Sequence, residues 1–278
     1  MYGPGVKVGY WQETALQEEM RVKDMQQGGN TLLDTTRAAY KHFYQDTMLG
    51  PPQEVVAFGV TLQVRPVKIS ICRQQVVDQN LALSVIITHE GMIRKCTTIN
   101  EMCDLTVAPS PRSTLRSSFR IVSPDDEDRS GQCLGYGEKF RLQTLDPVDE
   151  PMYLYSGPKR MNLSLPVDTG RYTTKNGELT LPLGVVSSKN CGPYARVPVS
   201  HTHFYCAHKD PDLRYESEGK TIPVNEPVII VHAVTNQNLA VEHVQADTPF
   251  GPELQVSVQT YKNVYKRETW KNLWKFCF

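Results

Sequence analysis

Four short sequence signatures occur three times in the same order, and this repetition constrains the fold more than any other feature of the chain. The first two signatures are paired apolar runs, which read FGVTLQV with NLALS, YGEKFRLQ with MYLYS, and VNEPVIIVH with NLAVE. The third is an acidic residue followed by leucine, at 104–107, 178–181 and 253–256. The fourth is an aromatic closing run around Phe119, Phe204 and Phe276. Each copy therefore predicts four short strands.

Three copies of four strands predict one closed all-β domain. The acidic signatures lie about 75 residues apart, whereas propeller blades and solenoid repeats are shorter, about 20 to 50 residues, and more numerous. Closing a sheet removes its edges and so prevents edge-to-edge association. We expect an all-β, β-trefoil-like fold of three MIR-like pseudo-repeats over residues 53–278.

Residues 1–52 differ in residue pattern from the rest of the chain and are expected to form an extended arm followed by two short helices. Glycine and proline in MYGPGVKVGYW predict extended backbone up to Trp11. Helical patterns follow at 13–25 and 31–48, the second with Asn30 as N-cap and closed by Pro51-Pro52. The second helix carries an apolar stripe of Leu32, Leu33, Thr36, Tyr40, Phe43, Tyr44 and Met48. The stripe can cover the downstream domain or a partner surface, and the sequence leaves both open.

Charge and cysteine content limit the partners and the compartment. Lys and Arg number 30 and Asp and Glu number 30, so overall charge favours neither nucleic acid nor a membrane surface. We find no secretory signal and no apolar window of about 18 residues, which indicates a soluble protein of the cytoplasm. The seven cysteines are odd in number and never spaced as CxxC, so we expect reduced, buried thiols.

The residues offer little for catalysis or for a metal. HTHFYCAHKD holds His201, His203, Cys206 and His208, but on a strand the first two would face away from the last two and could not share a zinc ion. Nucleophile elbows and phosphate loops are missing, and the acidic run at 125–128 is typical of a solvated turn. We therefore expect no catalytic residue, no metal, no cofactor and no enzyme activity.

The carboxyl end interleaves basic and aromatic residues. The basic residues are Lys262, Lys266, Arg267, Lys271 and Lys275, and the aromatic ones are Tyr261, Tyr265, Trp270 and Trp274. Such interleaving occurs where single-stranded nucleic acid binds or where an acidic protein surface docks. The interpretation we favour is a strand with solvated lysines around core aromatics.

Several of these runs resemble the cilia- and flagella-associated protein 161 family. The resemblance is carried by YGPGVKVGYW at 2–11, FRIVS at 119–123, YGEKFRL at 136–142, and VNEPVIIVHAVTNQNLAVEH at 224–243. It implies a structural microtubule inner protein that binds the α/β-tubulin lattice and neighbouring inner proteins on the luminal wall of the A-tubule of axonemal doublets. It further implies that copies of the protein repeat along the doublet of a cilium or flagellum, where they stabilise the axoneme and support motility. It implies no homo-oligomer, and neither nucleic acid nor membrane as a partner.

Under this interpretation the extended arm is the candidate partner-binding site. Its side chains, Tyr2, Pro4, Val6, Val8, Tyr10 and Trp11, would insert into a groove of the lattice and become ordered on binding. The alternative is a β-trefoil binding module of MIR type for sugar or inositol phosphate, because the third unit also resembles domains of calcium-release channels and luminal mannosyltransferases. That alternative requires a cluster of Arg and Lys, or an aromatic residue with paired acids, in one loop.

Overall fold

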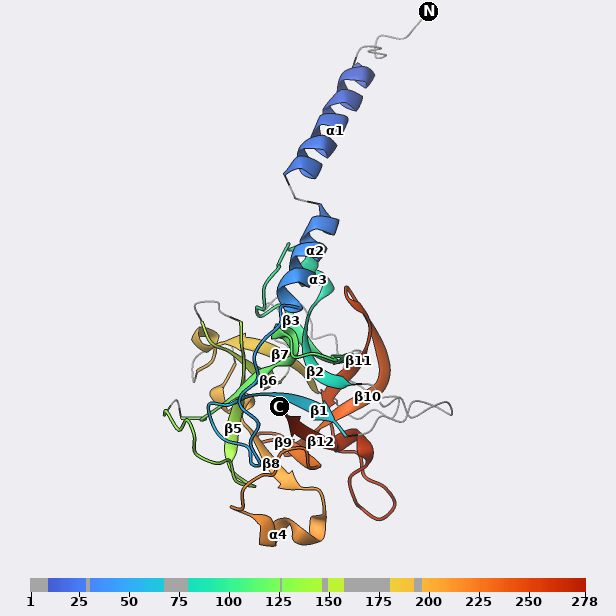
Figure 1. Cartoon of the computed structure of the whole chain (residues 1–278). Coiled ribbons are helices and arrows are strands. Elements are labelled where there is room, and N and C mark those ends of the chain that lie inside the picture. Colours follow the sequence, from blue (N-terminus) through green and yellow to red (C-terminus); the bar gives the residue numbers. More distant parts are fainter. Residues whose placement is uncertain are drawn as a thin grey trace, which may run out of the picture.

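A computed structural model provides the structure of the protein. The residues it describes are 10–28, 31–67, 80–125, 127–146, 150–157, 181–192 and 197–278. Within them a β-rich body carries two helices at its N-terminal side, and the first helix projects away from the body (Figure 1).

Two N-terminal helices are present, with bounds that differ from those expected. Helix α1 spans Tyr10–Gln27 and helix α2 spans Leu32–Phe43. Trp11 is therefore helical and not extended, because good helix formers follow it directly and Glu13 lies in the first turn. Thr31 and not Asn30 caps α2, since its Oγ1 accepts a hydrogen bond from the backbone N–H of Asp34 at 3.1 Å.

Helix α2 ends at Phe43, five residues earlier than the pattern predicts, because the chain beyond it is held by strand-like contacts with a distant segment. Asp46 forms a β-bridge with Thr114, and the N–H of Thr47 donates to the carbonyl of Ser113 at 3.1 Å. Two short helices lie elsewhere: α3 (His89–Ile93) and α4 (Arg214–Ser217). Among the helices of the described residues, none combines the length and apolarity that crossing a bilayer requires.

The described residues form twelve strands in one sheet, and the prediction of a mostly β chain is confirmed. Their bounds are β1 (Thr61–Pro66), β2 (Leu81–Ile87), β3 (Cys103–Pro109), β4 (Phe119–Val122), β5 (Lys139–Thr144), β6 (Met152–Ser156), β7 (Leu181–Ser187), β8 (Phe204–His208), β9 (Val228–His232), β10 (Gln237–Thr248), β11 (Gly251–Val258) and β12 (Trp274–Cys277).

The strand pairing closes on itself. Strands β1, β4, β5, β8, β9 and β12 pair antiparallel in that order, and β12 returns to β1 through the pairs Gln63↔Cys277 to Pro66↔Trp274. The remaining strands form the hairpins β2–β3, β6–β7 and β10–β11. The inner strands of these hairpins, β3, β7 and β11, pair with one another. The predicted closure of the sheet is confirmed.

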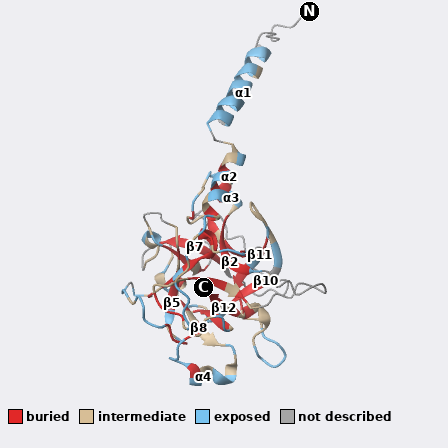
Figure 2. Ribbon diagram, viewed as in Figure 1, coloured by how far each residue is buried: buried red, intermediate tan, exposed pale blue. Residues whose placement is uncertain are grey.

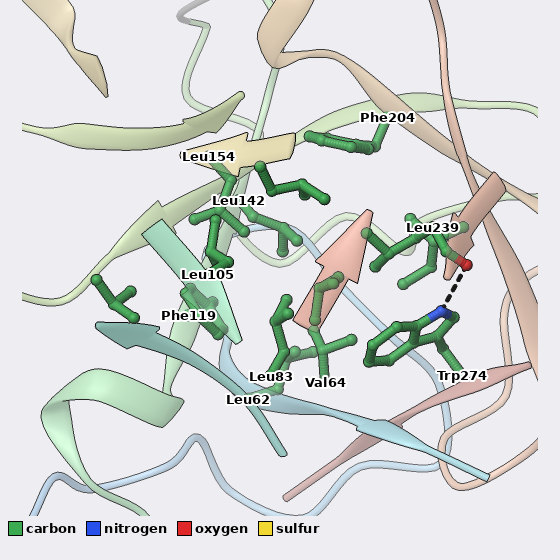
Figure 3. Packing of buried hydrophobic residues seen from close by; sticks show 14 of the residues in the cluster. Leu62, Val64, Leu83, Leu105, Phe119, Leu142, Leu154, Phe204, Leu239 and Trp274 are labelled. Carbon is green, nitrogen blue, oxygen red and sulfur yellow. Dashed lines mark hydrogen bonds between the residues drawn. The ribbon is translucent and has the colours of Figure 1, made fainter. Parts of the chain in front are cut away.

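The core lies inside this closed sheet and draws on all parts of it. The strands are coloured mostly as buried in Figure 2, and Leu62, Leu105, Phe119 and Leu142 are almost fully buried (Figure 3). Trp274 is fully buried as well, and its Nε1 donates a hydrogen bond to the carbonyl of Leu239 at 2.9 Å (Figure 3). Of the third signature, residues 178–180 lie outside the described residues, and β7 begins just after them.

Candidate interaction surfaces

Helix α1 presents large apolar side chains to solvent. Trp11 is 78% exposed, and Leu16, Met20 and Val22 are all more than half exposed (Figure 2). At about 100° per residue, Trp11 and Val22 share one side of the helix and Leu16 and Met20 share the other. Most helical stability in proteins comes from tertiary packing of an apolar face. Helix α1 therefore carries apolar surface that the rest of the described chain does not cover.

The predicted partner-binding residues fall in two groups. Tyr2, Pro4, Val6 and Val8 lie outside the described residues. Tyr10 and Trp11 open helix α1, so the extended conformation expected for these two residues is wrong. The Trp11 side chain nevertheless remains open to a partner because of its exposure.

Helix α2 is attached to the β-body through a face other than the predicted stripe. Its buried residues are Thr35, Ala39 and Phe43, spaced by four. Of the predicted stripe only Phe43 is buried, while Leu32, Leu33, Tyr40 and Met48 are exposed and Thr36 and Tyr44 are half-buried. In the body, α2 packs beside α3 and the 3-10 helix at Leu115–Ser117. Small side chains at 35 and 39 permit close approach on the buried face.

Phe250, at the turn between β10 and β11, packs beside α2. Its ring centroid lies 5.7 Å from Tyr40, 5.5 Å from Phe43 and 5.6 Å from Tyr44. Edge-on and tilted pairs at such distances are attractive beyond the area they bury. The β10–β11 hairpin therefore holds α2 against the body.

A buried charged network joins the end of α2 to the sheet. Arg116 donates through Nη2 to Glu253 Oε2 at 2.8 Å and through Nη1 to Tyr44 Oη at 2.8 Å. Its Nε donates to the carbonyl of Val85 at 3.1 Å, and Thr106 Oγ1 donates to Glu253 Oε2 at 2.5 Å. Both charged side chains are at most 3% exposed, and burial raises the pKa of Tyr44. The network thus connects α2 to β2, β3 and β11.

A second contact fixes the same helix. Asp146 Oδ2 lies 2.8 Å from His42 Nε2 and accepts from the N–H of Ile99 at 2.9 Å. The Asp146 side chain is 1% exposed. Helix α2 is therefore a rigid base from which α1 extends.

An open groove of about 950 Å³ lies at β8 and β9, beside α4 and the chain at 259–268. Arg214 Nη2 donates to Glu268 Oε2 at 2.7 Å, and Tyr205 Oη donates to Asn236 Oδ1 at 2.6 Å. The lining also carries Lys262 and Glu218, so positive and negative groups balance. Such a lining does not concentrate charge for a phosphate ligand.

The histidine-rich run differs from the strand expected of it. His201 lies in a 3-10 helix at Val199–Thr202, and β8 begins only at Phe204. The prediction that His201 and His203 share a strand face is wrong, because the backbone turns there: the N–H of His203 donates to the carbonyl of Ser200. In the part of the chain that the structure describes, no three His, Cys, Asp or Glu side chains are grouped to hold a metal ion.

The remaining sequence features are structural. Six cysteines are described and all are free thiols; Cys103, Cys206 and Cys277 are buried, whereas Cys133 is exposed, against the expectation of burial. Asp125, Glu127 and Asp128 are exposed, which confirms the solvated turn. Trp274 belongs to the core and Trp270 packs against it, as the strand interpretation of the carboxyl end predicts. Tyr265, however, is 80% exposed, and the strand is confined to Trp274–Cys277, so that interpretation is wrong for the chain at 262–267.

Comparison with known proteins identifies a family whose model matches most of the chain. The family model described as "Cilia- and flagella-associated protein 161-like domain" matches residues 35–278. Proteins named cilia- and flagella-associated protein 161 are similar over 99% of this chain: one from Mus musculus is 26% identical over 281 residues, 87% of its length, and one from Danio rerio is 25% identical over 300 residues, 87% of its length.

Solved structures offer weaker likenesses. An SDF2-like protein from Arabidopsis thaliana has a TM-score of 0.49 at 13% identity, over 80% of this chain and 94% of that one. A Caenorhabditis elegans protein of unknown function has a TM-score of 0.48 at 14% identity, over 82% of this chain and 98% of that one. Likenesses of this strength decide nothing about the chain.

Proposed function

Because the chain belongs to the cilia- and flagella-associated protein 161-like family, we propose that it is a structural, non-catalytic protein of the ciliary or flagellar axoneme. In this proposal it lies on the luminal wall of the A-tubule of doublet microtubules. There it binds the tubulin lattice and neighbouring inner proteins in periodic copies, and so stabilises the axoneme. The family match is the observation that carries the proposal.

The architecture supports an adhesive role. Helix α1 exposes Trp11, Leu16, Met20 and Val22, while α2 is held to the body by the buried Arg116 network. An exposed helix that is covalently joined to an anchored one connects a binding contact to a stable domain. Many weak contacts to a repeating lattice add through a high effective concentration, so no single site needs a recognisable motif.

The amino-terminal residues are the proposed lattice-binding segment. Tyr2, Pro4, Val6 and Val8 are expected to insert into a groove, and Tyr10 and Trp11 to continue that contact from the first turn of α1. Ordering on contact lets such a segment wrap a surface while its affinity for each site stays low.

We also infer that the closed sheet is a β-trefoil. Two features of the pairing support this inference: six strands form the ring, and three hairpins join through their inner strands. The three sequence repeats each supply two ring strands and one hairpin, as a pseudo-threefold fold requires.

Axonemes isolated from cells that express tagged protein test the proposal. Full-length protein should resist detergent and high-salt washing and leave only when the doublets dissolve. Deletion of residues 1–11 should release it in the salt wash, while Gln12→Ala, an exposed substitution in α1, should behave as wild type. Release of full-length protein by detergent alone would contradict the axonemal proposal. Equal retention of the truncated protein would contradict the proposal that residues 1–11 bind the lattice.

The groove at β8 and β9 is the candidate site for the sugar-binding alternative. Tyr136 and Tyr205 line it together with the amides of Asn236 and Asn238. Its balanced charge does not favour inositol phosphate. A glycan array with purified protein tests the alternative, and a Tyr205→Ala variant that lost a signal would place that ligand in the groove.

A further inference from the structure

The chain between β11 and β12 forms a tight loop, defined here as residues 262–267 and called the basic loop. A β-bridge between Lys262 and Glu268 closes it. The N–H of Asn263 donates to the carbonyl of Arg267 at 2.8 Å. The Asn263 Oδ1 accepts from the N–H groups of Tyr265 at 2.9 Å and Arg267 at 3.1 Å. The loop is thus fixed by its own hydrogen bonds.

Ion pairs brace the basic loop from outside. Arg267 Nη2 lies 3.0 Å from Asp212 Oδ2, in the 3-10 turn before α4. At the base of the loop, Glu268 is 3% exposed and pairs with Arg214 at 2.7 Å. A loop held in this way loses little conformational entropy when it binds, and preorganisation of this kind raises affinity.

The tip of the loop is apolar although it points to solvent. Val264 is 91% exposed and Tyr265 is 80% exposed. On α4 nearby, Tyr215 is 89% exposed, and it lines the same groove as Lys262. Tyrosine side chains on rigid surfaces are enriched among residues that dominate binding energy.

The charge of the loop indicates the chemistry of its partner. Lys262 and Lys266 are both exposed, and neither forms an ion pair with any residue that the structure describes. Arg267 is already paired, and the acid at the base of the loop, Glu268, is buried and paired. Two unneutralised lysines thus flank an apolar tip, which complements an acidic segment that carries an apolar side chain.

Nucleic acid fits this surface less well. Stacking of successive bases requires several open aromatic faces. Trp274 is fully buried, Trp270 packs against the core, and the Lys271 ammonium lies 4.0 Å from the centroid of the Tyr261 ring. In the basic loop this leaves Tyr265 as the open ring.

We propose that the basic loop is a docking site for an acidic, apolar-containing segment of a partner protein. The partner's carboxylates pair with Lys262 and Lys266, and its apolar side chain packs on Val264 and Tyr265. The loop lies at the end of the molecule away from α1 (Figure 1). The chain therefore presents two candidate docking regions, α1 and the basic loop. This inference goes beyond the proposed axonemal role, and its test requires purified protein only.

The test measures binding of the full chain to a fluorescent copolymer of glutamate and tyrosine by anisotropy at physiological salt. Wild type should bind it, and should bind polyglutamate alone more weakly. The variants Lys262→Glu/Lys266→Glu and Val264→Ser/Tyr265→Ser should each lose about tenfold in affinity. The matched control is Leu32→Ser/Leu33→Ser, two residues of α2 that are 66% and 67% exposed, and it should bind as wild type.

A folding control and three contrary outcomes complete the test. Because the substituted side chains are exposed, thermal melts of all variants should coincide with wild type, which separates lost binding from lost folding. No binding by wild type, or equal binding by wild type and both loop variants, would overturn the docking site. Tighter binding to an oligothymidine of about the same length would replace it with a nucleic-acid site.

Discussion

The buried Arg116–Glu253 pair yields the sharpest prediction about stability. Substitution Glu253→Gln preserves shape and removes the charge, so the guanidinium keeps Val85 and Tyr44 as acceptors but loses its counter-ion. Thr106 loses a carboxylate acceptor as well. Removing one partner of a buried pair costs about 3–5 kcal/mol, a large part of a net stability of about 5–15 kcal/mol.

The expected change is measurable in two ways. For a chain of this size a loss of about 3 kcal/mol lowers the melting temperature by roughly 6–12 °C. Urea unfolding followed by tryptophan fluorescence gives the free energy directly, since Trp274 moves from full burial to solvent. Arg116→Met should cost a similar amount, because it leaves Glu253 charged and unpaired.

The double variant separates this explanation from simple loss of packing. Arg116→Met with Glu253→Leu removes both charges and replaces them with apolar groups, which is often neutral or stabilising. We expect it to be at least about 2 kcal/mol more stable than the sum of the Arg116→Met and Glu253→Leu single effects predicts. The control is Glu90→Gln in the Arg94–Glu90 pair, which has a similar separation of 2.7 Å but is about half exposed and should change stability by less than about 0.5 kcal/mol. Additive single effects, or a Glu253→Gln variant as stable as wild type, would refute the reasoning.

Three further predictions concern closure, pH and the attachment of α2. Deletion of Leu273–Phe278 removes β12, which pairs with both β1 and β9, and should abolish the cooperative melt; a wild-type melting temperature would contradict this. Burial lowers the pKa of His232 to about 4 from an ordinary 6.5, so the unfolded chain binds the proton first as pH falls. The contribution of His232 to the free energy of unfolding is fully present above about pH 6.5 and falls by roughly 3 kcal/mol toward pH 4. In urea titrations at a series of pH values, a His232→Asn variant should lack this decrease. Phe250→Ala should loosen α2 and speed limited proteolysis between α2 and β1, and an unchanged cleavage rate would show that Phe250 does not hold the helix.

The strands were predictable because their pattern is local. Alternation of apolar side chains and the flanking turn residues report burial on a pleated surface, and the same four signatures occur three times. The closing run at 274–277 could be placed beside the opening strand only through the repeat, since no local signal states which strands pair. Repetition therefore supplied long-range information that a single copy does not contain.

The errors arose where tertiary contacts override a local pattern. The apolar stripe of α2 is real in the sequence, but the helix buries its Thr35, Ala39 and Phe43 face, because close approach to the body favours small side chains. The Arg116–Glu253 pair spans 137 residues, and no spacing rule connects its members. The available signal was Glu253 itself, the one charged residue of β11, which the sequence presents only as part of a repeated motif.

The location of the buried charges bears on the proposed adhesive role. A buried ion pair adds little stability compared with apolar residues of the same shape, so its value lies in fixing one arrangement. Here the pair fixes where the end of α2 meets β2, β3 and β11. If α1 and the basic loop bind at the same time, the position of α2 on the body sets the point from which the α1 segment reaches its partner, and avidity vanishes when the geometry fails. The Arg116→Met/Glu253→Leu variant should therefore fold well, bind the acidic copolymer as wild type does, and yet be retained less firmly on axonemes.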